Sequence, residues 1–236
     1  METDARLAPL EDACTVVIVR DGELGLETLM LERPASSSSF GGAWVFPGGK
    51  VDPEDRVDRT GAALDELTAA RVAGLRELAE ETGQALRPDE LIWLSQWTPM
   101  QALPRRFRTW FMLAPATAAQ IVLNPAEHQR HAWLTPGQAL ARHARGEMKL
   151  VPPTWVTLHN LDGATSVQQA LADAREHTAL SYNTHWLMPP DGSRPSGVLW
   201  AGDEAYPGFR DGAGVGAGAR HRLTITGLPW VFEHSN

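Results

Sequence analysis

The chain has 236 residues, of which 43% are hydrophobic and 21% are charged. This length fits one catalytic-sized core plus an extension, and the composition excludes wholesale disorder and a fibrous repeat. The 29 acidic and 21 basic side chains give a net charge of −8, which argues against binding to a nucleic-acid backbone. No apolar run reaches the ~18 residues that a membrane helix needs, and Cys14 is the only cysteine. We therefore expect a soluble, cytoplasmic protein with no disulfide and no nucleic-acid or membrane partner.

The first part of the chain alternates apolar runs with loop residues. Asp21-Gly22 predicts the turn of a hairpin between two strands. A small, polar stretch over 34–42 predicts a loop, and a charged stretch over 50–60 follows the next strand. Gly83 is placed as the left-handed C-cap of a long helix. The expected strands are 14–19, 24–31 and 43–46, and the expected helix is 62–82.

The second part carries further strands and helices in mixed order. Thr135-Pro136 predicts an N-cap followed by proline in the first helical turn. Glycines that alternate over 212–218 predict a mobile loop. We expect an α+β or α/β sandwich, with one domain over 1–177 and an extension over 178–236 that packs on it. The expected strands are 91–97, 106–114, 132–134, 223–225 and 230–232, and the expected helices are 136–145, 152–161 and 166–177.

Three glutamates lie close together on the long helix. At about 100° per residue, Glu80 lies about −60° and Glu81 about +40° from Glu77, so the three share one arc. A solvated helix face gives the same pattern. However, like charges at these spacings repel, and Arg76 is the one cation close by, so a bound cation would relieve the repulsion. The arc expected to face the sheet, away from the acids, holds Val72, Leu75, Leu78 and Ala79.

Small residues lie on the acidic side one turn earlier, at Ala73 and Gly74. Glycine inside a helix costs about 1 kcal/mol relative to alanine, which suggests that another backbone approaches closely there. The expected backbone is Gly48-Gly49, whose carbonyls could add oxygen ligands. Mg²⁺ and Mn²⁺ bind carboxylate, carbonyl and water oxygens and bridge substrate phosphates. An acidic protein could thus hold a phosphate substrate through a divalent metal.

These residues resemble the Nudix box, whose pattern is G-x5-E-x7-R-E-U-x-E-E-x-G-U with U a bulky apolar residue. Gly49 matches the first glycine and residues 76–83 match the second half. Asp55 stands where the first glutamate belongs, Gln84 replaces the last apolar residue, and Gly49 and Arg76 are 27 positions apart (76 minus 49) rather than 14. Nudix enzymes hydrolyse a nucleoside diphosphate linked to another moiety. The resemblance implies an α/β fold, the Nudix α/β/α sandwich with a mixed sheet between helices, here with a Pro/Gly-rich C-terminal extension.

The interruption of the box indicates one branch of the Nudix family. The interrupted box and the segments 45–49, 98–107 and 133–136 together resemble the sequences of the peroxisomal coenzyme A diphosphatase-like branch and its bacterial relatives. Arg108 falls where that branch is expected to carry an aspartate. The implied substrate is coenzyme A or an acyl-coenzyme A, with ADP-ribose, NADH or another nucleoside diphosphate derivative as the alternative. A non-catalytic module that senses a nucleotide is a third possibility, which the retained box glutamates and Arg76 disfavour. Many Nudix enzymes dimerise, so a homodimer is possible.

The resemblance also implies roles for individual residues. Arg76 would hold Glu77 in place, and the general base would be either Glu77 or Glu127, which lies in a later loop and is otherwise an ordinary loop acid. The histidines, His128 among them, lack the H-x-x-x-H ligand spacing, which favours structural or solvated roles. The implied ligands of Mg²⁺ or Mn²⁺ are Gly49, Glu77, Glu80 and Glu81. The candidate phosphate-binding arginines are Arg33, Arg105 and Arg106.

Overall fold

The computed structural model describes residues 7–37, 40–117, 120–125, 127–208 and 218–235. The strands are β1 (Leu10–Gly22), β2 (Gly25–Glu32), β3 (Trp44–Val45), β4 (Gly48–Lys50), β5 (Ile92–Pro99), β6 (Arg106–Pro115), β7 (Arg130–Leu134), β8 (Leu180–Leu187), β9 (Gly197–Leu199), β10 (His221–Thr224) and β11 (Val231–His234). The helices are α1 (Glu66–Thr82), α2 (Pro136–Ala144), α3 (Pro152–Leu161) and α4 (Val167–Glu176), with short 3₁₀ turns η1 (Pro53–Arg56) and η2 (Pro88–Glu90).

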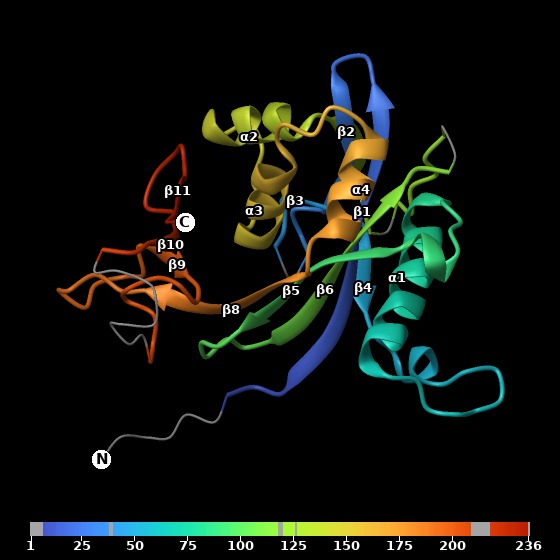
Figure 1. Cartoon of the computed structure of the whole chain (residues 1–236), viewed down its shortest axis with the longest axis horizontal. Coiled ribbons are helices and arrows are strands. Elements are labelled where there is room, and N and C mark those ends of the chain that lie inside the picture. Colours follow the sequence, from blue (N-terminus) through green and yellow to red (C-terminus); the bar gives the residue numbers. More distant parts are fainter. Residues whose placement is uncertain (1–6, 38–39, 118–119, 126, 209–217, 236) are drawn as a thin grey trace.

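One mixed sheet runs through the molecule in the order β11-β10-β9-β8-β5-β6-β1-β2-β3, with β4 paired to β1 and β7 paired to β2. Strand β1 is parallel to β6 and antiparallel to β2. Helix α1 lies on one side of this sheet and α2, α3 and α4 on the other (Figure 1). The predicted fold class, an α/β/α sandwich with a mixed sheet, is confirmed. No helix in the described ranges has the length and apolar character needed to cross a membrane.

The alternation of side chains along β1 builds a core on each face of the sheet. Cys14, Val16 and Ile18 are fully buried in the cluster under α1, whereas Val17 and Val19 are buried in the cluster under the other helices. Successive strand residues point to opposite faces, so a strand covered on both sides reads as a continuous apolar run. This explains why the run over 14–19 predicted a buried strand.

The long helix and the first hairpin differ in detail from their predictions. Helix α1 begins at Glu66 rather than Ala62, because Asp65 caps it by accepting a hydrogen bond from the Thr68 N–H at 3.0 Å. It ends as predicted at Gly83, which has a φ of 70°. The hairpin turn is residues 23–24 rather than Asp21-Gly22, since Gly22 still pairs with the residue that opens β2.

The chain after residue 177 continues the same sheet. Strand β8, which the sequence did not predict, runs parallel to β5, and β9, β10 and β11 follow it as antiparallel neighbours. The strands predicted at 223–225 and 230–232 correspond to β10 and β11. Most of the glycine-rich stretch predicted as a mobile loop, residues 212–217, lies outside the described residues.

Candidate metal and active site

Helix α1 packs on β1 through small side chains. Ala73 and Gly74 are buried, and a Cβ on Gly74 would lie 2.6 Å from the Sγ of Cys14. The close neighbour of Gly74 is therefore β1, and the expectation that it approaches Gly48-Gly49 is wrong. The predicted packing face is also wrong at Ala79, which is exposed, while Glu81 on the expected solvent side is buried. The helix approaches the sheet along its smallest residues, and this carries acidic side chains inward at its last turn.

Glu81 is the most deeply buried of the three glutamates, with 3% of its surface exposed. Its Oε2 accepts a hydrogen bond from the Gly48 N–H at 2.8 Å, and its Oε1 lies 2.8 Å from Nε2 of His128, which is 2% exposed. A Cβ on Gly48 would lie 2.2 Å from the carbonyl oxygen of Cys14, so glycine is needed for β4 to pass here. Both oxygens of Glu81 are thus held in place.

Glu77 lies against the next glycine of the same strand. A Cβ on Gly49 would lie 2.2 Å from Oε1 of Glu77, so the absence of a side chain makes room for this carboxylate. Burial raises the pKa of Glu77 above its ordinary value; Arg76 counteracts that rise, whereas the charges of Glu81 and Glu80 add to it. Another negative charge is therefore unfavourable here, and a cation would be stabilising.

Arg76 connects the glutamates to the loop that interrupts the box. Its Nη2 donates to Oδ2 of Asp55 at 2.8 Å and to the Lys50 carbonyl at 3.1 Å, and its Nη1 lies 2.9 Å from Glu77 and 3.3 Å from Glu80. The hydrogen bonds that Arg76 donates to Asp55 raise the pKa of Arg76 above its ordinary value. Asp55 is almost completely buried. Sequence reasoning gave Asp55 no role, although its spacing from Gly49 was the signal that could have found it.

The loop after residue 121 brings a fourth carboxylate to this place. The N–H groups of Val122 and Asn124 donate to the carbonyls of Thr82 and Glu81, at 3.0 and 3.3 Å, and so fix the loop to the end of α1. Glu127 is exposed, and its ligand atom and those of Glu81 and His128 all lie within 4.8 Å of one another. The structure therefore brings Glu127 and Glu81 together, and it adds His128, which sequence reasoning left aside for want of a ligand spacing.

The three candidate arginines have different surroundings. Arg106 is buried, and its guanidinium donates to the main-chain carbonyls of Pro99 and Ala8. Arg105 is exposed. Arg33 follows β2 directly, and its Nε is buried without a hydrogen-bond partner among the described residues. The hydrogen bonds of Arg106 give it a role in the fold, whereas Arg33 and Arg105 keep donors that a phosphate could use.

The donor set fits a hard divalent cation. Carboxylates gather at the end of α1 and in the adjoining loop. Among the arginines and lysines of the described ranges, Arg76 forms ion pairs with two of them, Glu77 and Glu80. Mg²⁺ and Mn²⁺ take oxygen ligands of this kind. The site could therefore hold such an ion, which would neutralise the excess charge. The carboxylates concerned are Glu77, Glu80, Glu81 and Glu127.

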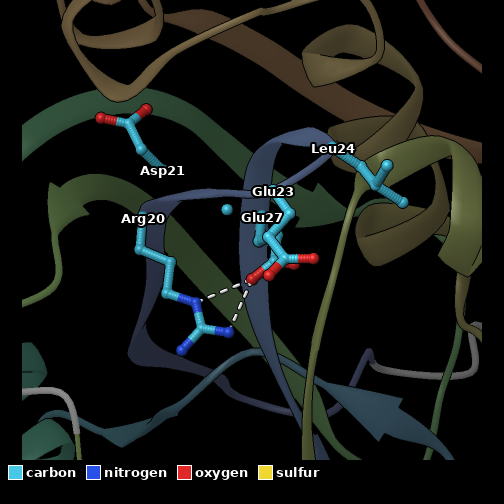
Figure 2. Close-up of a pocket in the computed structure, with 6 residues that line it drawn as sticks. Arg20, Asp21, Glu23, Leu24 and Glu27 are labelled. Carbon is cyan, nitrogen blue, oxygen red and sulfur yellow. Dashed lines mark hydrogen bonds and ion pairs between the residues drawn. The ribbon is translucent and has the colours of Figure 1, made fainter.

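Two hollows in the surface lie away from the carboxylates of the candidate metal site. One is at the tip of the β1–β2 hairpin, where Arg20 points toward Glu27 and pairs with it at 2.7 Å (Figure 2). Gly49, at the candidate site, pairs with Cys14 of β1. Arg20 lies six positions further along β1, which corresponds to about 20 Å, so this hollow is remote from the candidate site. The other, of about 710 Å³, is lined by α3, α4, β5 and β8, on the opposite face from α1. The candidate site is thus defined by its carboxylates and not by a closed pocket.

Comparison with known proteins identifies the family of this chain. The NUDIX domain model matches residues 10–153, which is more than half of the 236 residues. The chain belongs to the Nudix family. The family resemblance predicted from the box is thereby confirmed, and the narrower resemblance to the coenzyme A diphosphatase branch stays a prediction.

Two relatives illustrate the likeness. The m7GpppN-mRNA hydrolase NUDT17 of Danio rerio is 36% identical over 124 residues, which cover 46% of this chain and 37% of that protein. The chain thus matches little more than a third of the length of this relative. The crystal structure of a NUDIX hydrolase from Alicyclobacillus acidocaldarius superimposes with a TM-score of 0.61 at 25% identity, covering 71% of this chain and 97% of the other.

Proposed function

We propose that this protein hydrolyses the diphosphate bond of a nucleoside diphosphate linked to another moiety, with Mg²⁺ or Mn²⁺ as the cofactor. One observation carries the proposal. Buried Glu81 is held at both oxygens, by Gly48 and His128, beside further carboxylates that share the single guanidinium of Arg76. A protein that gathers this much negative charge at a fixed place is suited to bind a divalent cation there.

Each residue of the site has a proposed role. The metal would be held by Glu77, Glu80, Glu81 and the carbonyl of Gly49. A divalent ion bound there would stabilise charge on the diphosphate and lower the pKa of a bound water. Arg76 orients Glu77 through their 2.9 Å ion pair.

Proton transfer and phosphate binding fall to residues around the carboxylates. Glu127 accepts the proton of the attacking water because it is exposed beside Glu81, and Glu77 is the alternative base. Arg33 and Arg105 bind phosphate oxygens. Arg106, the third candidate, would have to give up its bonds to main-chain carbonyls to do so.

Coenzyme A or an acyl-coenzyme A is the proposed substrate, on the strength of the interrupted box. ADP-ribose or NADH is the alternative, and a nucleotide sensor without turnover is a further one. The printed name of the Danio rerio relative adds a capped dinucleotide to the compounds to be tested. The net charge of −8 favours a small diphosphate over a long nucleic acid.

The test is a substrate panel with the full chain. Coenzyme A, ADP-ribose, NADH, a diadenosine polyphosphate and a methylated cap dinucleotide are each incubated with Mg²⁺, Mn²⁺ or a chelator, and the products are separated by chromatography. We expect cleavage of a diphosphate bond with either metal and none with the chelator. Tight binding of one compound without turnover would instead establish the sensor, and turnover that survives the chelator would contradict the metal requirement.

The proposal extends to the organisation of the protein. We propose that residues 178–236 belong to the same folding unit as 1–177, which the pairing of β8 with β5 supports. A cytoplasmic location and a homodimer are proposed with it. Light scattering of the purified chain tests the dimer, and limited proteolysis tests whether the two segments separate.

A further inference from the structure

We propose that His128 supplies a nitrogen ligand to the metal centre, next to Glu81 and Glu127, so that the site prefers a transition-metal ion such as Mn²⁺ to Mg²⁺. The inference rests on the proposed function, because it concerns the same metal site. It goes further by assigning a ligand outside the box, and it specifies which class of ion the site selects.

The first argument is the separation of the ligand atoms. Nε2 of His128 lies 2.8 Å from Oε1 of Glu81, and the ligand atoms of these two residues and Glu127 lie within 4.8 Å of one another. Two ligands that each lie about 2.1 Å from an ion, at right angles, are about 3 Å apart. The imidazole and the carboxylate therefore already stand near the separation of neighbouring ligands of one ion.

The second argument is how the imidazole is held. His128 is 2% exposed. Its main-chain N–H donates to the main-chain carbonyl of Asn124 at 3.0 Å, so the backbone of His128 is fixed in the loop. Within the described ranges, the carboxylate of Glu81 is the hydrogen-bond partner of its ring, and its Nδ1 is buried without a partner. Buried His143 likewise has one ring nitrogen, Nε2, without a partner among the described residues, but its Nδ1 bonds to a main-chain carbonyl rather than a carboxylate, and its ring packs edge-on against Trp230. The ring of His128 is thus directed at a proposed metal ligand.

The third argument is the chemistry of the donor set. Carboxylate and carbonyl oxygens suit Mg²⁺ and Mn²⁺ alike, whereas imidazole nitrogen suits later first-row ions and is a poor ligand for Mg²⁺. A site made of oxygen atoms alone would discriminate weakly between Mg²⁺ and Mn²⁺. The addition of one imidazole shifts the preference toward Mn²⁺ and Co²⁺.

The test is pulsed electron paramagnetic resonance of the full chain loaded with Mn²⁺, which detects coupling to an imidazole nitrogen of a ligand. We expect this coupling in the wild type and its loss in His128→Gln. Glutamine can still donate a hydrogen bond to Glu81, so this variant separates a ligand from an anchor. The dissociation constant for Mn²⁺ should rise on the order of 10-fold while that for Mg²⁺ changes little. The matched control is His131→Gln, three positions on in β7, which should retain the coupling and both constants.

The outcomes separate this inference from the proposed function. If bound Mn²⁺ shows no imidazole coupling in the wild type, the inference is overturned, whatever the variant does and whether or not the variant folds. It is equally overturned if His128→Gln keeps the ratio of Mn²⁺ to Mg²⁺ affinity. A protein that shows the coupling and cleaves no compound of the panel would overturn the proposed function and leave the ligand assignment intact.

Discussion

Two buried carboxylates of this protein have opposite surroundings. Asp203, between β9 and β10, is 0% exposed and accepts hydrogen bonds from the N–H groups of Ala205 and His221, both at 2.9 Å, and from the guanidinium of Arg222. Burial alone raises the pKa of Asp203, but the bonds from Arg222 and the two amides outweigh it and hold this pKa below its usual range. One negative charge meets one positive charge, and each oxygen is hydrogen-bonded.

Glu81 is nearly as deeply buried, at 3% exposed, and has no such balance. In the described part of the chain its side chain meets an amide and an imidazole, and further carboxylates stand beside it. A carboxylate that serves the fold is neutralised within the chain, as Asp203 is. A carboxylate whose charge the chain leaves uncompensated indicates a cation from outside, and the predictions below test this difference.

The largest expected effect is on turnover at Glu81. Glu81→Gln should lower the rate of diphosphate hydrolysis with Mn²⁺ on the order of 10³-fold, because a metal ligand accounts for several kcal/mol of charge stabilisation in the transition state. Without metal, the variant should be at least as stable as the wild type, since it removes a repelling charge. Steady-state kinetics and thermal unfolding in chelator check the two statements. Glu66→Gln, in the exposed first turn of the same helix, is the control, and undiminished activity of Glu81→Gln would make the metal assignment wrong.

The opposite pattern is expected at Asp203. Asp203→Asn should lower the free energy of unfolding by about 3 kcal/mol, because it leaves the largely buried guanidinium of Arg222 without its counter-charge. The rate constants of the remaining folded enzyme should change little. Urea unfolding measures the effect, with Glu204→Gln as the control at the more exposed pair with Arg220, where less than about 1 kcal/mol is expected. Equal losses in the two variants would remove the distinction drawn between the two regions.

Much of the fold could be predicted because local signals agree with the tertiary structure. The apolar run that became β1, the glycine cap of α1 and the Thr135-Pro136 start of α2 each have a local physical cause. Strand β8 was missed because its residues are mostly half-buried or exposed and show no clear alternation. Its place is set by pairing with β5, which is remote in sequence. Local patterns cannot report such a pairing.

For the site, the sequence predicted which acids cluster and not how they are held. The helical wheel placed Glu77, Glu80 and Glu81 on one arc, and in the structure the charges of Glu80 and Glu81 act on Glu77. The wheel nevertheless pointed Glu81 to solvent, because it weighted apolar character over size. The helix packs on its alanines and Gly74 instead, and so Glu81 turns inward. The contact of His128 with Glu81 joins residues 47 positions apart and has no local pattern.

A methyl group at Gly49 tests whether space for Glu77 matters. Gly49→Ala should lower turnover by about 10- to 100-fold, because its Cβ would lie 2.2 Å from Oε1 of Glu77 and displace that carboxylate. Gly227→Ala in the C-terminal segment is the matched control, since nothing lies within 4 Å of its added Cβ. Initial rates at saturating metal compare the two. Wild-type rates in Gly49→Ala would mean that the position of Glu77 does not limit the reaction.

The guanidinium of Arg76 should be replaceable only in part. Arg76→Lys keeps the charge but loses the two-pronged contact with Asp55 and the simultaneous reach to Glu77, so turnover should fall about 10-fold. Arg87→Lys, an exposed pair with Asp89, should leave it unchanged. If the two lysine variants behaved alike, Arg76 would act only through its charge. The dissociation constant for Mn²⁺ should distinguish Arg76→Lys from Arg87→Lys most clearly, because a change in the orientation of Glu77 should weaken metal binding.

The smallest effect is a pH dependence of stability that belongs to Asp203. Its folded pKa lies below the unfolded value of about 3.9, so the unfolded chain binds the proton more readily. The stability that Asp203 contributes is therefore complete above about pH 5 and is lost as the pH falls through about 4 toward the lower folded pKa. Urea unfolding should be measured for the wild type and Asp203→Asn from pH 7 to pH 3. The difference between their free energies of unfolding should stay constant down to about pH 5 and then become smaller as the pH falls further. A difference that widened on acidification would mean that burial, rather than Arg222, controls this carboxylate.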